Sequence, residues 1–168
     1  MNRLLQSAAR LLIRQKMKIS ICESCTGGML GSMLTSIAGS SRYFLGGIIS
    51  YSNEVKLKIA GVKNKTLKEY GAVSAETACE MACVVRHRIR SDIGIGITGI
   101  AGPGGGTKKK PLGLVYIAVA TSKGTMVRKY LFKGSRRLIR ESACKKALLL
   151  LKDYLLLKIC VGHGGSKR

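Results

Sequence analysis

The sequence predicts an α/β fold, a three-layer α/β/α sandwich with a mixed, mostly parallel sheet and a late antiparallel hairpin. Two observations carry this prediction. Segments with helical spacing of apolar residues alternate with short apolar strands over residues 2–98, and two strand-like segments joined by Ser122-Lys123-Gly124 come later. We expect one domain over residues 1–161 and a disordered tail over 162–168, because 168 residues can bury one core and no linker or repeat divides them.

The first half of the chain begins with an amphipathic segment, Asn2–Gln15, whose leucines recur at helical spacing. Residues 1–18 contain no acid, as in an organellar transit segment, but we interpret them as a folded helix because a strand follows at once. The next elements are expected to be strands at Lys18–Cys22 and Phe44–Ser52, and helices at Thr26–Ser36, Asn53–Ile59 and Lys63–Tyr70, the last closed by Gly71.

The second half begins with a long helix to Arg90, for which Ser74 is the predicted N-cap and Glu76 favours the first turn. The remaining elements are expected to be a glycine-alternating strand at Ile93–Thr98, a loop at Gly99–Pro111, hairpin strands at Leu112–Ala120 and Thr125–Phe132, and a helix at Arg136–Lys158. Gly94, Gly96 and Gly99 fit the spacing of a dinucleotide-binding motif, but we reject it because the glycines lie within the strand.

The charge of the chain is strongly positive, with 30 Lys and Arg against 8 Asp and Glu, a formal +22. Such a field attracts nucleotides, nucleic acid or anionic membranes, although basic residues scattered along the whole chain also fit a composition bias without a selected partner. The longest apolar candidate for a membrane span, Ala147–Ile159, is broken by Lys152, Asp153 and Lys158. With no secretory signal visible, we expect a cytoplasmic protein that does not enter a membrane.

The cysteines form two closely spaced pairs, Cys22 with Cys25 and Cys79 with Cys83. Zinc is one interpretation of this spacing, but no histidine lies near either pair. We therefore expect reduced, partly buried thiols, no metal and no cofactor.

The turn Glu23–Gly28 follows the first strand and places hydroxyls and a carboxylate where open α/β sheets hold their ligands. Ser24 needs a base to act as a nucleophile, and a neutral lysine can serve. Lys56 follows the second strand, and partial burial among so many cations would disfavour its charged form. The alternative is structural: Ser24 caps a helix and Lys56 is a solvated surface lysine.

Other segments offer further groups to the same edge. Ser40-Ser41 is a second hydroxyl source or simply a turn. The loop Gly99–Thr107 either cradles a phosphate with its backbone N–H groups or is a flexible connector. Lys108–Lys110 is either a steering patch for anions or a solvated run, and a guanidinium from Arg136, Arg137 or Arg140 is a candidate phosphate clamp.

Seven segments resemble, in order, the CinA C-terminal domain family of competence/damage-inducible proteins, over about Leu4 to Tyr154. They are Glu23–Gly28, Gly39–Ser41, Tyr51–Lys56, Gly71–Ser74, Thr98–Gly106, Lys110–Gly113 and Phe132–Arg136. Stand-alone members of this family are nicotinamide mononucleotide deamidases, and the larger members carry an additional N-terminal domain that this sequence lacks. The resemblance implies a homodimeric Ser/Lys amidohydrolase that binds a small nucleotide and releases ammonia and nicotinic acid mononucleotide.

Site roles follow from this resemblance. Ser24, Lys56, Tyr51 and Ser41 are implied to be catalytic, and whether Ser24 or Ser41 is the nucleophile stays open. The implied substrate-binding residues are Glu23, Thr26, Gly27, Gly28, Thr98, Gly99, Gly102, Arg136 and Arg140. We expect N–H groups near Gly27-Gly28 or Gly99 to hold an oxyanion, and Glu23 and Tyr51 to orient the lysine or the amide.

One departure from the family pattern concerns the predicted phosphate clamp. Ser135 stands where the family usually has aspartate, which bears on whether the neighbouring arginine is correctly ordered. The competing hypothesis is a catalytically degenerate member that binds nucleic acid through its basic surface. Against it, the sequence has no nucleic-acid motif and only 5% aromatic residues for base stacking.

Overall fold

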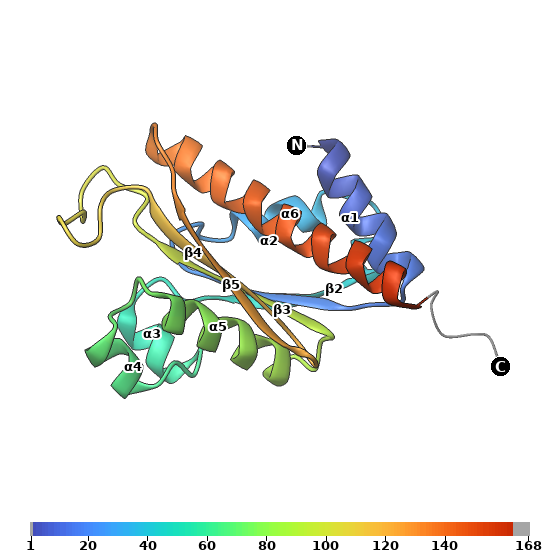
Figure 1. The fold of residues 1–168 in the computed structure, drawn as a ribbon, viewed down its shortest axis with the longest axis horizontal. Coiled ribbons are helices and arrows are strands. Elements are labelled where there is room, and N and C mark those ends of the chain that lie inside the picture. Colours follow the sequence, from blue (N-terminus) through green and yellow to red (C-terminus); the bar gives the residue numbers. More distant parts are fainter. Residues whose placement is uncertain (1, 163–168) are drawn as a thin grey trace.

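The structure, a computed structural model, describes residues 2–162 and consists of a five-stranded sheet between two layers of helices (Figure 1). The elements are α1 (Asn2–Arg14), β1 (Ile19–Glu23), α2 (Met29–Thr35), the 3-10 turn η1 (Ser40–Arg42), β2 (Phe44–Ile49), α3 (Asn53–Lys58), α4 (Asn64–Glu69), α5 (Ala75–Arg88), β3 (Ile93–Gly99), β4 (Leu114–Thr121), β5 (Gly124–Leu131) and α6 (Arg136–Gly162).

The strands lie in the order β2-β1-β3-β4-β5. β1 pairs in parallel with β2 and with β3, whereas β4 is antiparallel to both β3 and β5. Four strands therefore run in one direction and β4 alone runs against them, which confirms the predicted mixed, mostly parallel sheet with a late hairpin. In consequence, the carboxyl ends of β1, β2 and β3 meet at one edge of the sheet.

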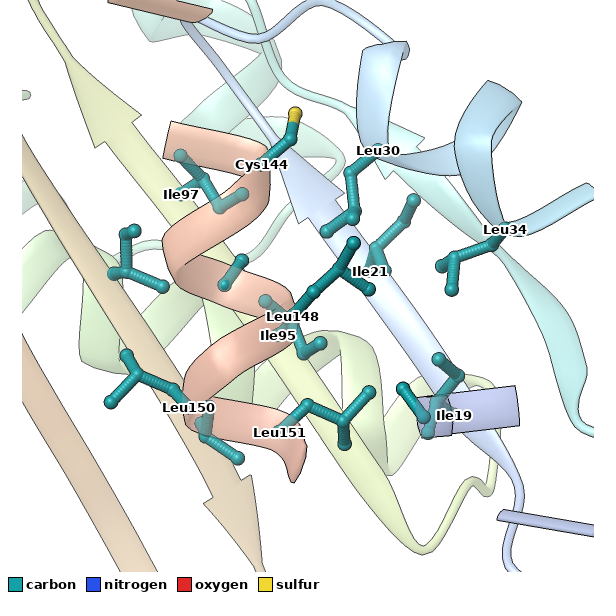
Figure 2. Close-up of a cluster of buried hydrophobic side chains, with 14 of the residues drawn as sticks. Ile19, Ile21, Leu30, Leu34, Ile95, Ile97, Cys144, Leu148, Leu150 and Leu151 are labelled. Atoms are coloured by element: carbon teal, nitrogen blue, oxygen red, sulfur yellow. The ribbon is translucent and has the colours of Figure 1, made fainter. Parts of the chain in front are cut away.

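The first helical layer consists of α1, α2 and α6, which pack on one face of the sheet (Figure 1). Figure 2 shows leucines of α6, among them Leu148 and Leu151, against the isoleucines Ile19, Ile21 and Ile95 of the strands. These side chains are buried and form the main hydrophobic core. Burial of a large aliphatic side chain contributes about 1.5–3 kcal/mol, so each of these leucines and isoleucines stabilises the packing of α6 on the sheet by about that amount.

The second layer is built on α5, which lies against β1, β3, β4 and β5, with α4 beside it. The alternating glycines of β3 explain the close approach of this helix. A Cβ on Gly94 would lie 2.1 Å from the Ala82 carbonyl oxygen, and one on Gly96 would lie 2.3 Å from that of Ala78. The glycines therefore serve helix–sheet packing, in agreement with the rejection of a dinucleotide-binding motif.

Element boundaries differ from the sequence prediction mainly around the first strand. β1 extends to Glu23, and α2 begins at Met29 instead of Thr26, because Gly27 and Gly28 have φ of 56° and 91° and interrupt a right-handed helix. β2 ends at Ile49, three residues before the predicted end. The predicted tail, apart from Gly162 at the end of α6, lies outside the described residues.

Over residues 2–162, the structure contains no helix that combines the length and the apolar character needed to cross a membrane. α6 is long, but charged side chains recur along it.

Candidate active site

A pocket of about 280 Å³ opens at the carboxyl ends of β1, β2 and β3. Five segments line it: Ser24 and Cys25 after β1; Tyr51, Asn53 and Lys56 after β2; Ala72 and Val73 before α5; Thr98–Gly102 with Gly104 and Gly105 at the end of β3; and Arg136 at the start of α6. Open α/β sheets hold ligands at this edge, and the volume is near the lower end of the roughly 300–1,000 Å³ usual for small-molecule sites.

Ser24 and Lys56 meet inside this pocket. The Lys56 Nζ lies 3.0 Å from the Ser24 Oγ. Local structure explains the meeting, since Ser24 is the first residue after β1 and its N–H donates to the Ile97 carbonyl of β3 at 2.9 Å. The Ser52 side chain caps α3 by accepting from the Val55 N–H at 3.1 Å, and this short helix turns Lys56 back over the edge of the sheet.

Lys56 is buried, with 2% of its surface exposed. Its amine lies 2.7 Å from the Ser50 carbonyl oxygen and 3.4 Å from that of Tyr51. The salt bridges of the described residues join other groups, so no carboxylate neutralises this lysine. Burial lowers the pKa of Lys56, and the weaker influence of the neighbouring Cys22 and Cys25 opposes that shift. Burial therefore shifts Lys56 toward the neutral amine, the form that could accept the Ser24 proton.

The thiols near the site are not suited to nucleophilic attack. Cys25 lines the pocket, but burial raises its pKa to about 11, so it stays protonated near neutral pH. Burial likewise raises the pKa of Cys22 to about 11. The two thiols belong to different hydrophobic clusters, and in the described part of the chain no group of three or more His, Cys, Asp or Glu side chains is arranged to hold a metal.

Glu23, expected to bind substrate or orient the lysine, is not among the residues that line the pocket. Its carboxylate is buried and accepts hydrogen bonds from the N–H groups of Gly28 (3.0 Å), Leu30 (3.2 Å) and Gly31 (2.8 Å). The carboxylate therefore fixes the turn and the start of α2 beneath Ser24. Because the Gly28 N–H is used by Glu23 and the Gly27 N–H donates to the Ser24 carbonyl at 3.1 Å, neither glycine offers an oxyanion donor.

Arg140 and Thr26 also act on the turn and do not line the pocket. The Arg140 guanidinium donates to the Thr26 carbonyl, with the shorter contact, from Nη2, at 2.7 Å. Both residues were expected to touch substrate, but in this structure the Arg140 side chain and the Thr26 carbonyl contact each other outside the pocket lining. The arginine thereby holds the Glu23–Gly28 turn against α6.

Arg136 is the arginine that does line the pocket. Its Nη2 donates to the Tyr51 hydroxyl at 2.7 Å, and its Nη1 donates to the Gly102 carbonyl. The guanidinium thereby connects the segment after β2 with the loop after β3 across the pocket. Ser135 directly precedes α6, and its Oγ accepts a hydrogen bond from the Leu138 N–H at 3.4 Å in the first turn of that helix.

The loop after β3 forms the opposite wall. Thr98 is buried and its hydroxyl donates to the Ala72 carbonyl at 2.6 Å, which joins β3 to the segment before α5. Near its C-terminal end the loop is held to the segment after α4, because the Lys110 Nζ donates to the Tyr70 carbonyl at 2.6 Å. Gly104 and Gly105 line the pocket, and a Cβ on Gly104 would meet no atom within 4 Å. The loop leaves room for a ligand beside its backbone.

Ser41 of this chain lies elsewhere, which corrects its predicted place in the site. It is an exposed residue of η1, three positions before β2 begins, whereas Ser24 and Lys56 lie beyond the strand ends. The six residues of β2 span about 20 Å. Within one chain, Ser24 is therefore the candidate nucleophile and Ser41 is not.

Asn53, Cys25 and Val73 line the pocket but were not singled out as site residues by sequence reasoning. Each lies within a segment that carried the family resemblance, so proximity to Ser24, Lys56 and Ser74 in the sequence was the available signal. What the sequence does not contain is the direction in which each side chain points.

Comparison with known proteins gives consistent matches. The CinA C-terminal domain family matches residues 1–155. A CinA-like protein of Endomicrobium trichonymphae is 50% identical over 151 residues, and one of Syntrophomonas wolfei is 49% identical over 152; each alignment covers 90% of this chain. This chain spans only 35–36% of the length of these relatives.

Solved structures match over nearly their whole length. A CinA superfamily protein of Klebsiella pneumoniae superposes with a TM-score of 0.89 at 30% identity, covering 92% of this chain and 96% of that one. Another from Enterobacter cloacae gives 0.87 at 32% identity, with 90% of each chain covered.

Proposed function

Because the chain belongs to the CinA C-terminal domain family, we propose that its pocket hydrolyses the carboxamide of nicotinamide mononucleotide, yielding nicotinic acid mononucleotide and ammonia. The contact that carries this proposal is the 3.0 Å approach of the buried Lys56 amine to the Ser24 hydroxyl in a pocket at the ligand-binding edge of the sheet. A serine with a neutral lysine as its base is a known way to activate a hydroxyl for acyl transfer.

In the proposed first step, Lys56 Nζ takes the Ser24 hydroxyl proton as Oγ attacks the carboxamide carbon. The oxyanion that forms needs donors, and the backbone N–H group of Cys25, which lines the pocket beside Ser24, is a candidate. It donates to no other backbone group in the described part of the chain. Such preorganised donors commonly supply the largest share of catalysis. The protonated Lys56 then gives its proton to the departing nitrogen, ammonia leaves, and a Ser24 ester remains.

In the second step, water attacks the ester carbonyl while Lys56 accepts a proton from it. Collapse of the tetrahedral intermediate returns a proton to Ser24 Oγ and releases the pyridine carboxylate. The balance is one water consumed and one ammonia released, with no redox change. No metal or cofactor takes part in this scheme.

The remainder of the substrate would occupy the pocket between Tyr51 and the loop after β3. Tyr51, 59% exposed, offers an aromatic face at the rim for the pyridine ring. Arg136 and the backbone of Gly102–Gly105 surround the position proposed for the ribose phosphate. A guanidinium and backbone N–H groups are suited to a phosphate dianion.

The direct test is ammonia release by the purified protein from nicotinamide mononucleotide, compared with nicotinamide and with NAD. The proposal predicts turnover of the mononucleotide, a much lower kcat/KM for nicotinamide because it lacks the phosphate, and loss of turnover in Ser24→Ala. Undiminished ammonia release by Ser24→Ala, or no release by the wild type, would overturn it.

A further inference from the structure

The excess of positive charge is largest in one long stretch of the chain that contains no acid. Residues 93–140 include ten Lys and Arg and no Asp or Glu. β3, β4 and β5 all lie in this stretch, and β5 forms one edge of the sheet. The other edge, β2, has the sequence FLGGII without a charge, whereas β5 carries Arg128 and Lys129, both exposed. The β5 side of the sheet is therefore strongly basic.

Few carboxylates neutralise this side of the sheet. On α5, Glu80 turns toward α4, where it accepts a hydrogen bond from the Thr66 hydroxyl at 2.8 Å. On α6, Glu141 is paired with Arg137 at 2.8 Å. The salt bridges among residues 2–162 do not involve β5, so the two cations of this strand keep their charge toward solvent.

The backbone of β5 adds hydrogen-bond donors to this edge. The Phe132 N–H donates to the Gly113 carbonyl at 2.9 Å, on the side of β4. Because this orientation alternates along an antiparallel strand, the N–H of Arg128 also faces β4 and that of Lys129 points outward. Side chains alternate as well, so Arg128 and Lys129 flank the outward N–H groups from opposite faces of the sheet. Cations and backbone N–H groups together are suited to phosphate oxygens.

Lysines from neighbouring segments lengthen the basic edge. Exposed Lys123 lies in the hairpin turn before β5, and exposed Lys133 follows its end. From α6, the Nζ of exposed Lys146 lies 5.7 Å from the centroid of the Tyr130 ring of β5. We call these three lysines, with the Arg128 and Lys129 of the strand, the β5 edge. The eight residues of β5 span about 27 Å, so the cations recur along a line of at least this length.

An aromatic pair lies among these cations. Tyr130 and Phe132 are half-buried, and their rings stack with centroids 5.5 Å apart and planes inclined by 13°. Burial raises the pKa of Tyr130, and the weaker effects of Arg128, which lowers it, and of Asp153, which raises it, show that both charges lie near the ring. Partly exposed rings beside cations are the combination that binds the unstacked bases of single-stranded nucleic acid.

We propose that the β5 edge binds single-stranded nucleic acid, with phosphates along Arg128, Lys129 and the outward N–H groups, and a base against Tyr130 and Phe132. The rise of about 3.4 Å per residue of an antiparallel strand matches the spacing of about 3.4 Å between successive phosphates along one strand of stacked DNA. A line of cations beside aromatic rings fits such a strand better than a flat membrane surface, or a duplex whose bases are stacked inside.

This surface is separate from the candidate active site, because no residue of β5 lines the pocket. The proposal therefore does not rest on the proposed hydrolysis and does not require its loss. The structural alternative is edge protection, since exposed charges on an edge strand also prevent its pairing with other chains. Edge protection predicts no affinity for a nucleic-acid strand, and binding measurements distinguish the two.

The first experiment measures the affinity of the purified protein for a fluorescent oligothymidylate of about 16 nucleotides by anisotropy, at about 50 to 200 mM salt. Each phosphate contact to a single strand releases about 0.7 counterion, which corresponds to about eightfold in affinity at about 50 mM salt. Arg128→Gln/Lys129→Gln removes two such contacts. We therefore expect binding about 60-fold weaker at that salt and a salt slope smaller by about 1.4.

The matched control is Lys65→Gln/Lys68→Gln, which removes the same charge from exposed positions of α4. It should weaken binding by less than about threefold, because it changes only the general field of the protein. Equal losses in the two double variants would show that net charge alone attracts the strand, and would overturn the proposal. A wild type that does not bind the oligothymidylate overturns it as well.

Competition separates a single strand from other polyanions. The competitors are unlabelled oligothymidylate, a duplex of the same length, and vesicles of phosphatidylcholine and phosphatidylserine in equal parts. We expect the single strand to compete at least about tenfold better than the duplex or the vesicles at equal phosphate concentration, because only its bases can reach the aromatic pair. Equal competition by the duplex or by the vesicles would contradict the assignment to a single strand.

Ultraviolet crosslinking of the oligothymidylate to the wild-type protein, followed by peptide mass analysis, locates the bound base. We expect crosslinks on Tyr130 or Phe132. Tyr51 at the pocket, 59% exposed, is the internal comparison, since a strand that binds at the pocket would crosslink there. Crosslinks confined to Tyr51 would refute the proposed surface. If circular dichroism shows that the Arg128→Gln/Lys129→Gln protein is unfolded, this crosslinking result decides in its place.

Discussion

Replacement of Lys56 by arginine is the sharpest perturbation of the proposed catalytic pair. Arginine keeps a positive charge and hydrogen-bond donors at this position, but its guanidinium is not deprotonated in proteins. If Lys56 acts as a base toward the Ser24 hydroxyl 3.0 Å away, the arginine variant fails although the charge is retained. If the lysine only supplies a positive charge to the site, the variant keeps much of its activity.

The expected loss of activity in the Lys56 variants can be estimated from the role of this contact. Lys56 Nζ is the one basic nitrogen that hydrogen-bonds Ser24 Oγ among the described residues. A positioned general base contributes roughly 10²–10⁴ in rate. At 1.36 kcal/mol per tenfold, that is a loss of about 2.7–5.5 kcal/mol of transition-state stabilisation. We expect this loss in kcat/KM for Lys56→Arg and for Lys56→Met alike.

The assay is initial-rate ammonia release from nicotinamide mononucleotide, with circular dichroism to verify folding of each variant. Lys58→Met is the matched control, because Lys58 lies on the same helix with a side chain 72% exposed and paired with Glu54. It should stay within about twofold of wild type, since an exposed i,i+4 pair contributes only about 0.3–0.5 kcal/mol. A folded Lys56→Arg protein with more than a tenth of wild-type activity would refute the reasoning.

Four further predictions follow from the same structure. Because burial lowers the pKa of Lys56 and the base must be neutral, kcat/KM should rise about tenfold per pH unit and level off at a pKa below that of an ordinary lysine; a flat profile from pH 5 to 9 would contradict this. Between the lowered pKa of Lys56 in the folded protein and the ordinary lysine pKa of 10.5, the unfolded chain binds a proton that the folded chain has released. The free energy of unfolding of the wild type relative to that of Lys56→Met should therefore increase with pH over this range in urea titrations. Cys25→Ala should keep more than a tenth of wild-type activity, since a thiol with a pKa of about 11 is not the nucleophile. Gly96→Ala should lower the free energy of unfolding by about 1–3 kcal/mol because its Cβ would press on the α5 backbone, whereas Gly104→Ala should change it by less than about 0.5 kcal/mol.

The general architecture could be predicted from the sequence because each layer leaves a local periodic signal. The glycine–isoleucine alternation of β3 and the leucine spacing of α1 are examples, and both elements lie where they were expected. Ser24 and Lys56 were found for a related reason. Each follows the end of a parallel strand, and the topology rule for such sheets brings those ends together.

The details of the site could not be predicted, because they depend on which partner each polar group selects in three dimensions. The Glu23 carboxylate accepts hydrogen bonds from three N–H groups at the start of α2, and Arg140 donates to the Thr26 carbonyl. Neither pairing leaves a recognisable pattern in the sequence. Within one chain, Ser41 lies at the other end of β2 from Lys56 and Ser24, because it precedes a parallel strand whereas Ser24 follows one. A motif alone does not distinguish the two ends of the sheet.

The most direct test of the central claim is intact-mass analysis of the protein quenched with acid during turnover of nicotinamide mononucleotide. The account predicts a transient adduct equal to the substrate less ammonia, mapped by peptide analysis to Ser24 and absent from Ser24→Ala. An adduct on any other residue, or steady ammonia release by Ser24→Ala, would contradict it.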